Sequence, residues 1–411
     1  MIRPLVVLLP LLAACTQSGV SLSPGDGYER ALAQLDLNLA STLDRIEAQP
    51  TDWTIRAEAA GVYRQRARLS GDWSDYAASE AQLAQAFEPA GPGSGPFMTQ
   101  AGLHLTLHRL AESETAVARA EQRINLDDPT RASVALSRAR IDLLTDGYDD
   151  AAQHIALAIS LQDSVGAHSD AGRLAWVTGD FDRAHAEYDR AESMYHGISD
   201  EPRAWFHLQR GLMDLDRGRY DEALAHYLDA DAALPGYWLV HEHIAEVLWA
   251  KGDLSGADTL YADVVARTGA PDLQDTYAEF LMERGEDDRA SELLAAADTT
   301  WQTRLEQFPD AAYGHALGHY LRTDPQRAVD IARAQVQSQP SAASRTALAQ
   351  ALLNTGELDE ARVTIDAAMA TAWRHADTYA IASRVYAQLG LDDATALCDS
   401  AHAINPDADC G

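Results

Sequence analysis

Histidine is the residue type in this chain whose number and spacing could support metal or acid–base chemistry. The chain has 14 histidines. Two pairs, His104 with His108 and His315 with His319, are four residues apart on segments that we predict to be helical. That spacing can place two imidazoles on one metal ion. Neither pair has a cysteine or carboxylate at an obvious ligand spacing, so we expect structural or surface histidines and no metal site.

Other local patterns that resemble catalytic motifs lack an essential part. His241-Glu242-His243 has its second histidine two places on, whereas the zinc-protease motif needs four. The Gly-Ser-Gly in residues 88–96 follows no strand and precedes no Gly-Lys-Ser/Thr, so it is read as a linker. Acid pairs such as Asp149-Asp150 stand at helix starts, where the helix dipole favours them. We therefore predict no catalytic residues, no cofactor and no enzymatic activity.

The first cysteine follows a short apolar segment. Residues 1–14 contain Arg3, an apolar run and two alanines, which is typical of a secretory signal peptide and too short to span a bilayer. Leu12-Ala13-Ala14-Cys15 resembles the lipobox of bacterial lipoproteins. The resemblance implies that Cys15 is acylated and anchors the protein in a membrane. With Thr16 after the cysteine, the outer membrane facing the periplasm is favoured over the inner membrane and the cell surface.

The other two cysteines, Cys398 and Cys410, lie near the C-terminus. Paired cysteines in an exported protein favour a disulfide, which would fold the tail back over the last helix as a cap. The alternative is one buried thiol and one thiol in the tail.

The charge of the chain argues against a nucleic-acid partner. The formal net charge is −31 and Lys251 is the only lysine among 411 residues. Such a surface repels phosphate backbones. A well-solvated acidic face and an adaptation to high salt both explain this charge.

Most of the chain has the sequence pattern of helices that follow one another at a fixed period. Residues 15–27 are rich in Gly, Ser and Pro and are expected to form a flexible tether. Residues 28–48 predict one amphipathic helix. Residues 51–127 contain two irregular helix pairs, and residues 128–411 contain about eight regular units with a C-terminal cap.

The regular units share a column of alanines 33 to 39 residues apart. These anchor residues are Ala151, Ala184, Ala223, Ala257, Ala290, Ala328, Ala361 and Ala394. Twelve residues before each anchor stands Gly or Ala, and five residues before it stands Gly in five units. Small residues that face each other let two helices touch, and stacked pairs build a continuous core. The two longest spacings predict extended helices or loops near residues 194–202 and 299–309.

This pattern resembles the tetratricopeptide repeat (TPR). Its clearest copy is Gly211-x11-Ala223-x3-Tyr227-x2-Ala230-x4-Pro235. The resemblance implies an all-α, right-handed superhelical solenoid of antiparallel helix pairs. It also implies a concave groove, lined by the first helices, that binds a partner protein or peptide.

Two columns of the first helices are expected to line that groove, eleven and eight residues before each anchor, together with acids one turn earlier. The candidate partner-binding residues are Arg140, Arg173, Trp176, Glu242, Glu246, Trp249, Asp275, Glu279 and Tyr320. Arginine and aromatic residues often carry binding energy. The alternative is that the large residues are core and the charged residues are a solvated face.

The sequence thus predicts a lipid-anchored protein-interaction scaffold of the bacterial cell envelope. Two alternatives stay open: a metal-binding or enzymatic envelope protein that uses the clustered histidines, and a surface structural lipoprotein. The pattern specifies neither the partner nor an oligomeric state.

Overall fold

The computed structural model describes residues 20–91, 93–123 and 126–411. These residues form 21 α-helices and contain no strand. The predicted signal peptide and Cys15 lie outside the described residues. Within the described ranges, no helix combines the length and the apolar character that a membrane span requires.

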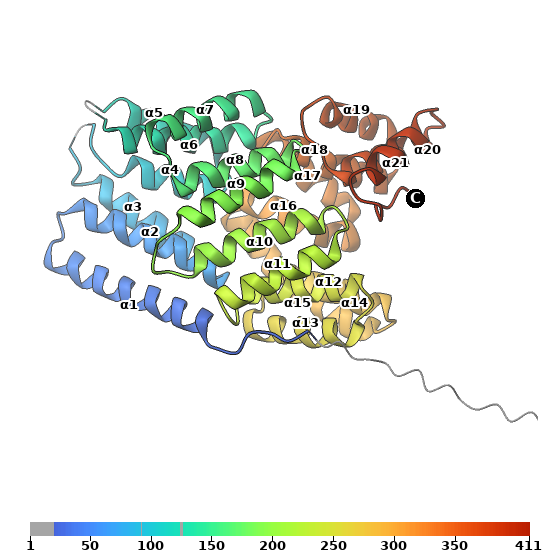
Figure 1. Ribbon diagram of the computed structural model, residues 1–411, viewed down its shortest axis with the longest axis horizontal. Coiled ribbons are helices and arrows are strands. Elements are labelled where there is room, and N and C mark those ends of the chain that lie inside the picture. The colour runs from blue at the N-terminus through green and yellow to red at the C-terminus, as the bar shows by residue number, and fades with distance from the viewer. Residues whose placement is uncertain (1–19, 92, 124–125) are drawn as a thin grey trace, which may run out of the picture.

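A single helix, α1, is followed by ten helix pairs that run from α2–α3 to α20–α21 (Figure 1). The bounds are α1 Gly27–Ala48, α2 Trp53–Ser70, α3 Ser74–Phe87, α4 Phe97–Thr106, α5 Leu110–Glu121, α6 Asp128–Leu143, α7 Tyr148–Leu161, α8 Val165–Val177, α9 Phe181–Met194, α10 Glu201–Leu215, α11 Tyr220–Ala233, α12 Trp238–Ala250, α13 Leu254–Thr268, α14 Pro271–Glu283, α15 Asp287–Gln307, α16 Pro309–Thr323, α17 Pro325–Ser338, α18 Ala342–Thr355, α19 Leu358–Met369, α20 Ala376–Gln388 and α21 Ala394–His402. The expected all-α, TPR-like solenoid is confirmed.

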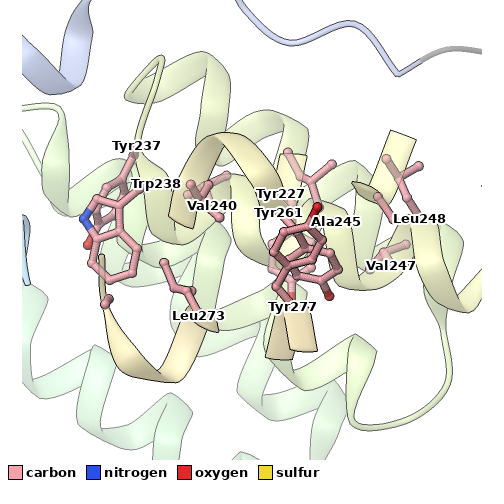
Figure 2. Packing of buried hydrophobic residues seen from close by; sticks show 14 of the residues in the cluster. Tyr227, Tyr237, Trp238, Val240, Ala245, Val247, Leu248, Tyr261, Leu273 and Tyr277 are labelled. Atoms are coloured by element: carbon pink, nitrogen blue, oxygen red, sulfur yellow. The ribbon is translucent and has the colours of Figure 1, made fainter. Parts of the chain in front are cut away.

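Small residues let the helices of a pair touch, as the spacing predicted. In the α10–α11 pair, Ala223 and Ala230 are 0% exposed, and the ring of Tyr227 lies over Gly211. Aromatic rings then link one pair to the next: Tyr261 of α13 stacks on Tyr277 of α14 with ring centroids 5.8 Å apart. Figure 2 shows these rings gathered around Ala245. From α10 to α15 the core is therefore continuous from pair to pair.

The five glycines that precede an anchor by five residues all have positive φ and turn the chain between the helices of a pair. They are Gly179, Gly218, Gly252, Gly285 and Gly356. In the α6–α7 turn the same position is held by Asp146, at φ 62°. Left-handed backbone at a non-glycine residue is uncommon and costs about 1 kcal/mol or more, so something else must retain the aspartate.

The two long spacings are built differently. Around residue 300 the second helix itself is extended, since α15 runs for 21 residues and buries Trp301 completely. After α9, by contrast, the chain forms a loop between Tyr195 and Asp200, and Ile198 is fully exposed there. The sequence predicted an extended helix or a surface loop at each place, and the structure has one of each.

Residues 20–27 differ from the flexible tether that their composition suggested. Val20 and Leu22 pack against the core near α11 and α12. The Ser23 amide donates a hydrogen bond of 2.6 Å to Asp231 Oδ2, and the Tyr28 amide donates one of 3.0 Å to Pro235 O. Two partly buried apolar side chains and these two bonds hold the segment at the α11–α12 junction.

The solenoid is closed on itself along a contact that we call the seam. Here turns within the early pairs meet junctions between the later pairs. Its hydrogen bonds join Leu69 to Trp238, His108 to Gln339, Asp146 to Ala342 and Val177 to Arg374, at 2.7–2.9 Å. Solenoid repeats usually contact only their sequence neighbours, whereas these partners are 169 to 231 residues apart.

The seam explains the residue in the α6–α7 turn. Asp146 Oδ1 accepts a hydrogen bond of 2.8 Å from the Ala342 amide, and its other oxygen pairs with Arg345. His108, also at positive φ (57°), bonds Gln339 across the seam. Among the described residues, these two are the non-glycine residues with left-handed backbone. The side chain of each makes a hydrogen bond across the seam.

Candidate functional site

A groove of about 460 Å³ lies on the first helices of the last three pairs. We call it the C-terminal groove. Its lining residues come from α16 (Gly314, Leu317, Gly318, Leu321), α18 (Ala343, Thr346, Ala347, Gln350), the end of the α19–α20 loop and α20 (Trp373, His375, Asp377, Thr378, Ala380, Ile381, Arg384), and the tail (Asp409). This is the face that the TPR resemblance assigned to partner binding.

The groove is wide because its floor is built from small residues. Gly314 and Gly318 are one turn apart on α16, opposite Ala343 and Ala347 of α18. A Cβ added to Gly318 would meet nothing within 4 Å. Helix backbone is thus left accessible between the apolar side chains of Leu321 and Ile381, which gives room for a side chain or a segment of another molecule.

One end of the groove carries a cation. Arg384 Nη1 lies 3.4 Å from Gln350 Oε1, and among the described residues no carboxylate oxygen lies within 4.0 Å of its guanidinium. Nearby, burial lowers the pKa of His375, but a contact of 3.5 Å with Asp216 outweighs this effect and raises the pKa. In a chain of net charge −31, this edge can attract a carboxylate.

The C-terminal tail lies at the edge of the groove. A disulfide joins Cys398 to Cys410 and holds the tail back against α21. Asp409 lines the groove, and the last residue, Gly411, lies against the stem of Arg384. The arrangement corresponds to the expected end cap, and it also gives the tail a place beside the groove.

The column eleven residues before each anchor only partly forms one surface. Two of its members, Leu317 and Gln350, line the C-terminal groove. Arg140 is in a different region, where its Nε lies 2.9 Å from Oδ2 of the buried Asp170. Arg173 lies near the same aspartate, whose pKa is raised by burial. The basic patch of Arg140 and Arg173 is thus present, but it already holds an internal carboxylate.

The second column, eight residues before each anchor, is core rather than groove floor. Tyr320 is 2% exposed. Trp249 packs edge-on against Tyr261 and Phe280, and Trp176 packs against a buried cluster of α8, α9 and α10. Trp176 and Trp249 stay partly exposed, and Trp249 contacts Phe280 of the next pair as well as Tyr261 of its own. These aromatic side chains therefore pack mainly between helices, as in the alternative that the sequence left open.

The acidic patch is also engaged internally. Asp275 is 5% exposed and accepts hydrogen bonds from Trp301 Nε1 (2.7 Å) and His319 Nδ1 (2.6 Å). Glu279 pairs with Arg322. Glu242 and Glu246 both contact His243 Nδ1, at 3.0 and 3.1 Å. Asp275 and Glu242 are thus buried within the fold, whereas Glu246 and Glu279 are paired but keep side chains that are 39% and 42% exposed.

The four histidines of the two helical pairs do not form a metal site within the described residues. His108 bonds Gln339, and His319 bonds Asp275. Neither they nor His104 and His315 belong to any described group of three or more ligand atoms that converge.

The sequence reasoning missed several residues of the C-terminal groove, chiefly Gly318, Trp373 and Arg384. A signal was present in α16, where Gly314 and Gly318 are spaced one turn apart within a helix. Glycine weakens a helix interior by about 1 kcal/mol relative to alanine, so two on one face point to a position where backbone must stay accessible.

No family model matches this chain, and no curated protein matches it in sequence. Among solved structures it is similar to yeast Tom70, with 14% identity, 90% of this chain and 91% of that chain covered, and a TM-score of 0.49. It is also similar to PilW, a type IV pilus biogenesis factor (18% identity, 52% and 92% covered, TM-score 0.40), and to human IFIT1 with m7Gppp-AAAA (14%, 93% and 96%, TM-score 0.45). These structures carry no argument about the function of this chain.

Proposed function

We propose that this protein is a lipid-anchored protein-interaction scaffold of the bacterial cell envelope, and that it binds a segment of a partner protein in the C-terminal groove. The observation that carries the proposal is the groove itself, which combines an apolar floor, accessible helix backbone and an arginine without a carboxylate partner among the described residues.

The lining favours a segment with an apolar side chain. Leu321, Ile381 and Trp373 offer the apolar contacts, and Gly318 leaves the space in which such a side chain would sit. Burying one Leu- or Phe-sized side chain contributes about 1.5–3 kcal/mol. Thr346 and Thr378, whose hydroxyls are 2.9 Å apart, offer hydrogen-bonding groups beside it.

The charge favours a segment that also carries a carboxylate. Arg384 lies at the end of the groove, and a guanidinium can hold a carboxylate by two parallel hydrogen bonds. Asp377 and Asp409 also line the groove and repel a carboxylate, so we expect the carboxylate of the segment at Arg384 and not along the rest of the lining. We therefore expect the partner segment to place an Asp, a Glu or a C-terminal carboxylate a few residues from its apolar anchor.

The anchor is proposed at Cys15, from the resemblance of residues 12–15 to a lipobox. Val20 is the first described residue and lies near the α11–α12 junction. Five residues of extended chain span at most about 18 Å. Acyl chains on Cys15 would therefore hold this junction close to the membrane. In Figure 1 the described chain begins at the lower edge of the molecule, whereas α18 and α20 lie toward the upper right.

Site-specific photo-crosslinking in native membranes tests this function. A photoreactive residue at Gln350, inside the groove, is expected to capture one partner, and the crosslinked peptide of that partner should contain an apolar and an acidic residue. Val363 on α19 is 70% exposed and outside the groove, so the same probe there is the matched control. Two results would overturn the proposal. One is capture of the same proteins at both positions, and the other is capture from Gln350 that Arg384→Glu leaves unchanged.

A further inference from the structure

Three histidines and two aspartates gather where α9, α10 and α11 meet. His185 Nε2 lies 3.4 Å from Asp214 Oδ1, and His226 Nε2 lies 3.6 Å from Asp214 Oδ2. His185 and His226 stack with ring centroids 5.7 Å apart. One ligand atom from each of these three residues can be chosen so that all lie within 4.8 Å of one another.

These contacts are too long to be good hydrogen bonds, and polar atoms are left over. Asp214 is 2% exposed, and its Oδ1 has no hydrogen-bond partner among the described residues. His226 Nδ1 is also buried and also lacks a partner among them. A buried carboxylate without partners costs free energy. A cation between the three side chains would satisfy it.

The spacing fits a tetrahedral metal. Ligand atoms that bind Zn²⁺ at ~2.1 Å with tetrahedral geometry lie ~3.4 Å from each other. His185 Nε2 lies 3.4 Å from one oxygen of Asp214, His226 Nε2 lies 3.6 Å from the other oxygen, and one atom from each of the three residues can be chosen within 4.8 Å of the other two. Two imidazoles and a carboxylate are a ligand set that Zn²⁺ accepts. The side chains of His185 and His226 are 27% and 23% exposed, so an ion could enter from solvent.

A second Asp–His pair in the chain shows what the same spacing does without a third ligand. Asp142 and His154 are twelve residues apart, as are Asp214 and His226. There Asp142 Oδ2 and His154 Nδ1 form a direct hydrogen bond of 2.7 Å. At Asp214 the corresponding histidine, His226, lies 3.6 Å away, and His185 of the preceding pair lies 3.4 Å from the same carboxylate. Neither histidine therefore forms a short hydrogen bond with Asp214.

Arg217 is the nearby group that opposes a cation. Its Nη1 lies 3.6 Å from Asp214 Oδ1, again too far for a hydrogen bond, and the guanidinium rests on the Phe181 ring at 4.1 Å. The acids Asp182 and Glu222 lie close enough to act on its charge. Arg219 acts on that charge in the opposite sense, and Arg210 acts on His226 but is itself paired with Asp189 and Glu192. Asp214, Asp182 and Glu222 thus face Arg217 and Arg219, and the balance of these charges stays negative.

We propose that His185, Asp214 and His226 form a Zn²⁺-binding site that links the α8–α9 pair to the α10–α11 pair. The site has an open position for water or a further ligand. His207 lies beside it, with its ring 6.2 Å from that of His226, but its Nε2 is 3.1 Å from Glu192. We therefore do not assign His207 as a ligand.

Titration of the full chain with ZnCl₂ tests the site, after removal of bound metal and with the Cys398–Cys410 disulfide intact. Calorimetry should show one Zn²⁺ per chain, and Co²⁺ in its place should give the visible absorption of a tetrahedral site. His185→Ala and His226→Ala should each weaken Zn²⁺ binding by about 100-fold, whereas the matched control His154→Ala should bind as the parent chain does.

Three results would overturn the assignment. One is the absence of stoichiometric Zn²⁺ binding by the parent chain. Another is unchanged binding in both His185→Ala and His226→Ala. The third is loss of binding in His207→Ala without loss in His185→Ala, which would move the ion to His207, His226 and Asp229. Thermal melting of the metal-free variants shows whether each is folded, so that lost binding is not mistaken for lost structure.

Discussion

Gly211 and Tyr227 face each other across the α10–α11 pair so closely that no other residue fits at Gly211. A Cβ at this glycine would lie 2.3 Å from Cε1 of the tyrosine ring, and the ring is 0% exposed and cannot move away. The related contact of Gly172 with Tyr188 is looser, at 3.2 Å. Of these two glycine–tyrosine contacts, the one in the α10–α11 pair is the tighter.

Gly211→Leu is expected to destabilise the protein. Overpacking a core costs ~1–3 kcal/mol, which exceeds the gain of about 1 kcal/mol from removing a helix-interior glycine. Thermal and urea unfolding followed by circular dichroism measure the change. An unchanged midpoint would contradict the packing described for Gly211 and Tyr227.

Gly318→Leu is expected to have the opposite effect on stability while it blocks the groove. A Cβ there meets nothing within 4 Å, and leucine is the better helix former by up to about 1 kcal/mol. The melting temperature should stay the same or rise, and crosslinking through Gln350 should be lost. If partner capture persists in a folded Gly318→Leu chain, the partner does not bind where we propose.

The stability of the protein is expected to fall as the pH rises above neutrality, because of His243. Burial lowers the pKa of this histidine, but Glu242 and Glu246 outweigh it and raise the pKa to about 9. A group whose pKa is higher in the folded state stabilises fully below its unfolded pKa, about 6.5, and loses that contribution as the pH rises through 9. Burial also raises the pKa of Glu242, to about 7, so its own effect on stability falls between about pH 4.5 and 7, below the range in which His243 acts.

Urea unfolding of the parent chain and of His243→Gln between pH 6 and pH 9.5 measures this effect. The difference in unfolding free energy between the two should be largest at pH 6 and shrink toward pH 9.5. Glu246→Gln keeps the histidine and removes one carboxylate, so its pH dependence should be weaker than that of the parent. A difference that is independent of pH would show that His243 does not titrate as described.

Asp146→Gly is expected to loosen the seam without disturbing the turn that carries it. Glycine adopts the φ of 62° without strain, so the backbone is kept and the hydrogen bond to Ala342 and the ion pair with Arg345 are removed. Hydrogen exchange at the Ala342 amide should become faster, as should exchange at the neighbouring seam amide of Arg374. Gly356, another turn glycine, has nothing within 4 Å of an added Cβ, and Gly356→Asn serves as a control away from the seam.

The local rules of the fold could be read from the sequence because they depend on residues within one pair. The small residues at Gly211 and Ala223, the ring at Tyr227 and the turn at Gly218 are all set by helix geometry over a span of about 20 residues. The loop after α9 and the long α15 were both anticipated as places where the period is stretched. At α15 the outcome depended on Trp301, whose burial favours continuing the helix.

The site could be predicted only in part, because closure of the solenoid is a property of the whole array. The bond between Asp146 and Ala342 joins residues 196 apart, and it results from the sum of small rotations between pairs that no local spacing reveals. A groove was expected along the first helices of all eight regular units. The groove we find is confined to the last three pairs, with Leu317 and Gln350 as the shared members.

The seam also sets the number of helix pairs. In an open array one pair can be added or removed, and each remaining pair keeps its neighbours. Here an extra pair inserted between Asp146 and Ala342 would carry every later junction past its partner, so that Arg374 would no longer meet Val177 and Gln339 would no longer meet His108. Repeat proteins usually change length by duplication or deletion of a unit. In this protein, such a change between Asp146 and Ala342 would break the contacts of the seam.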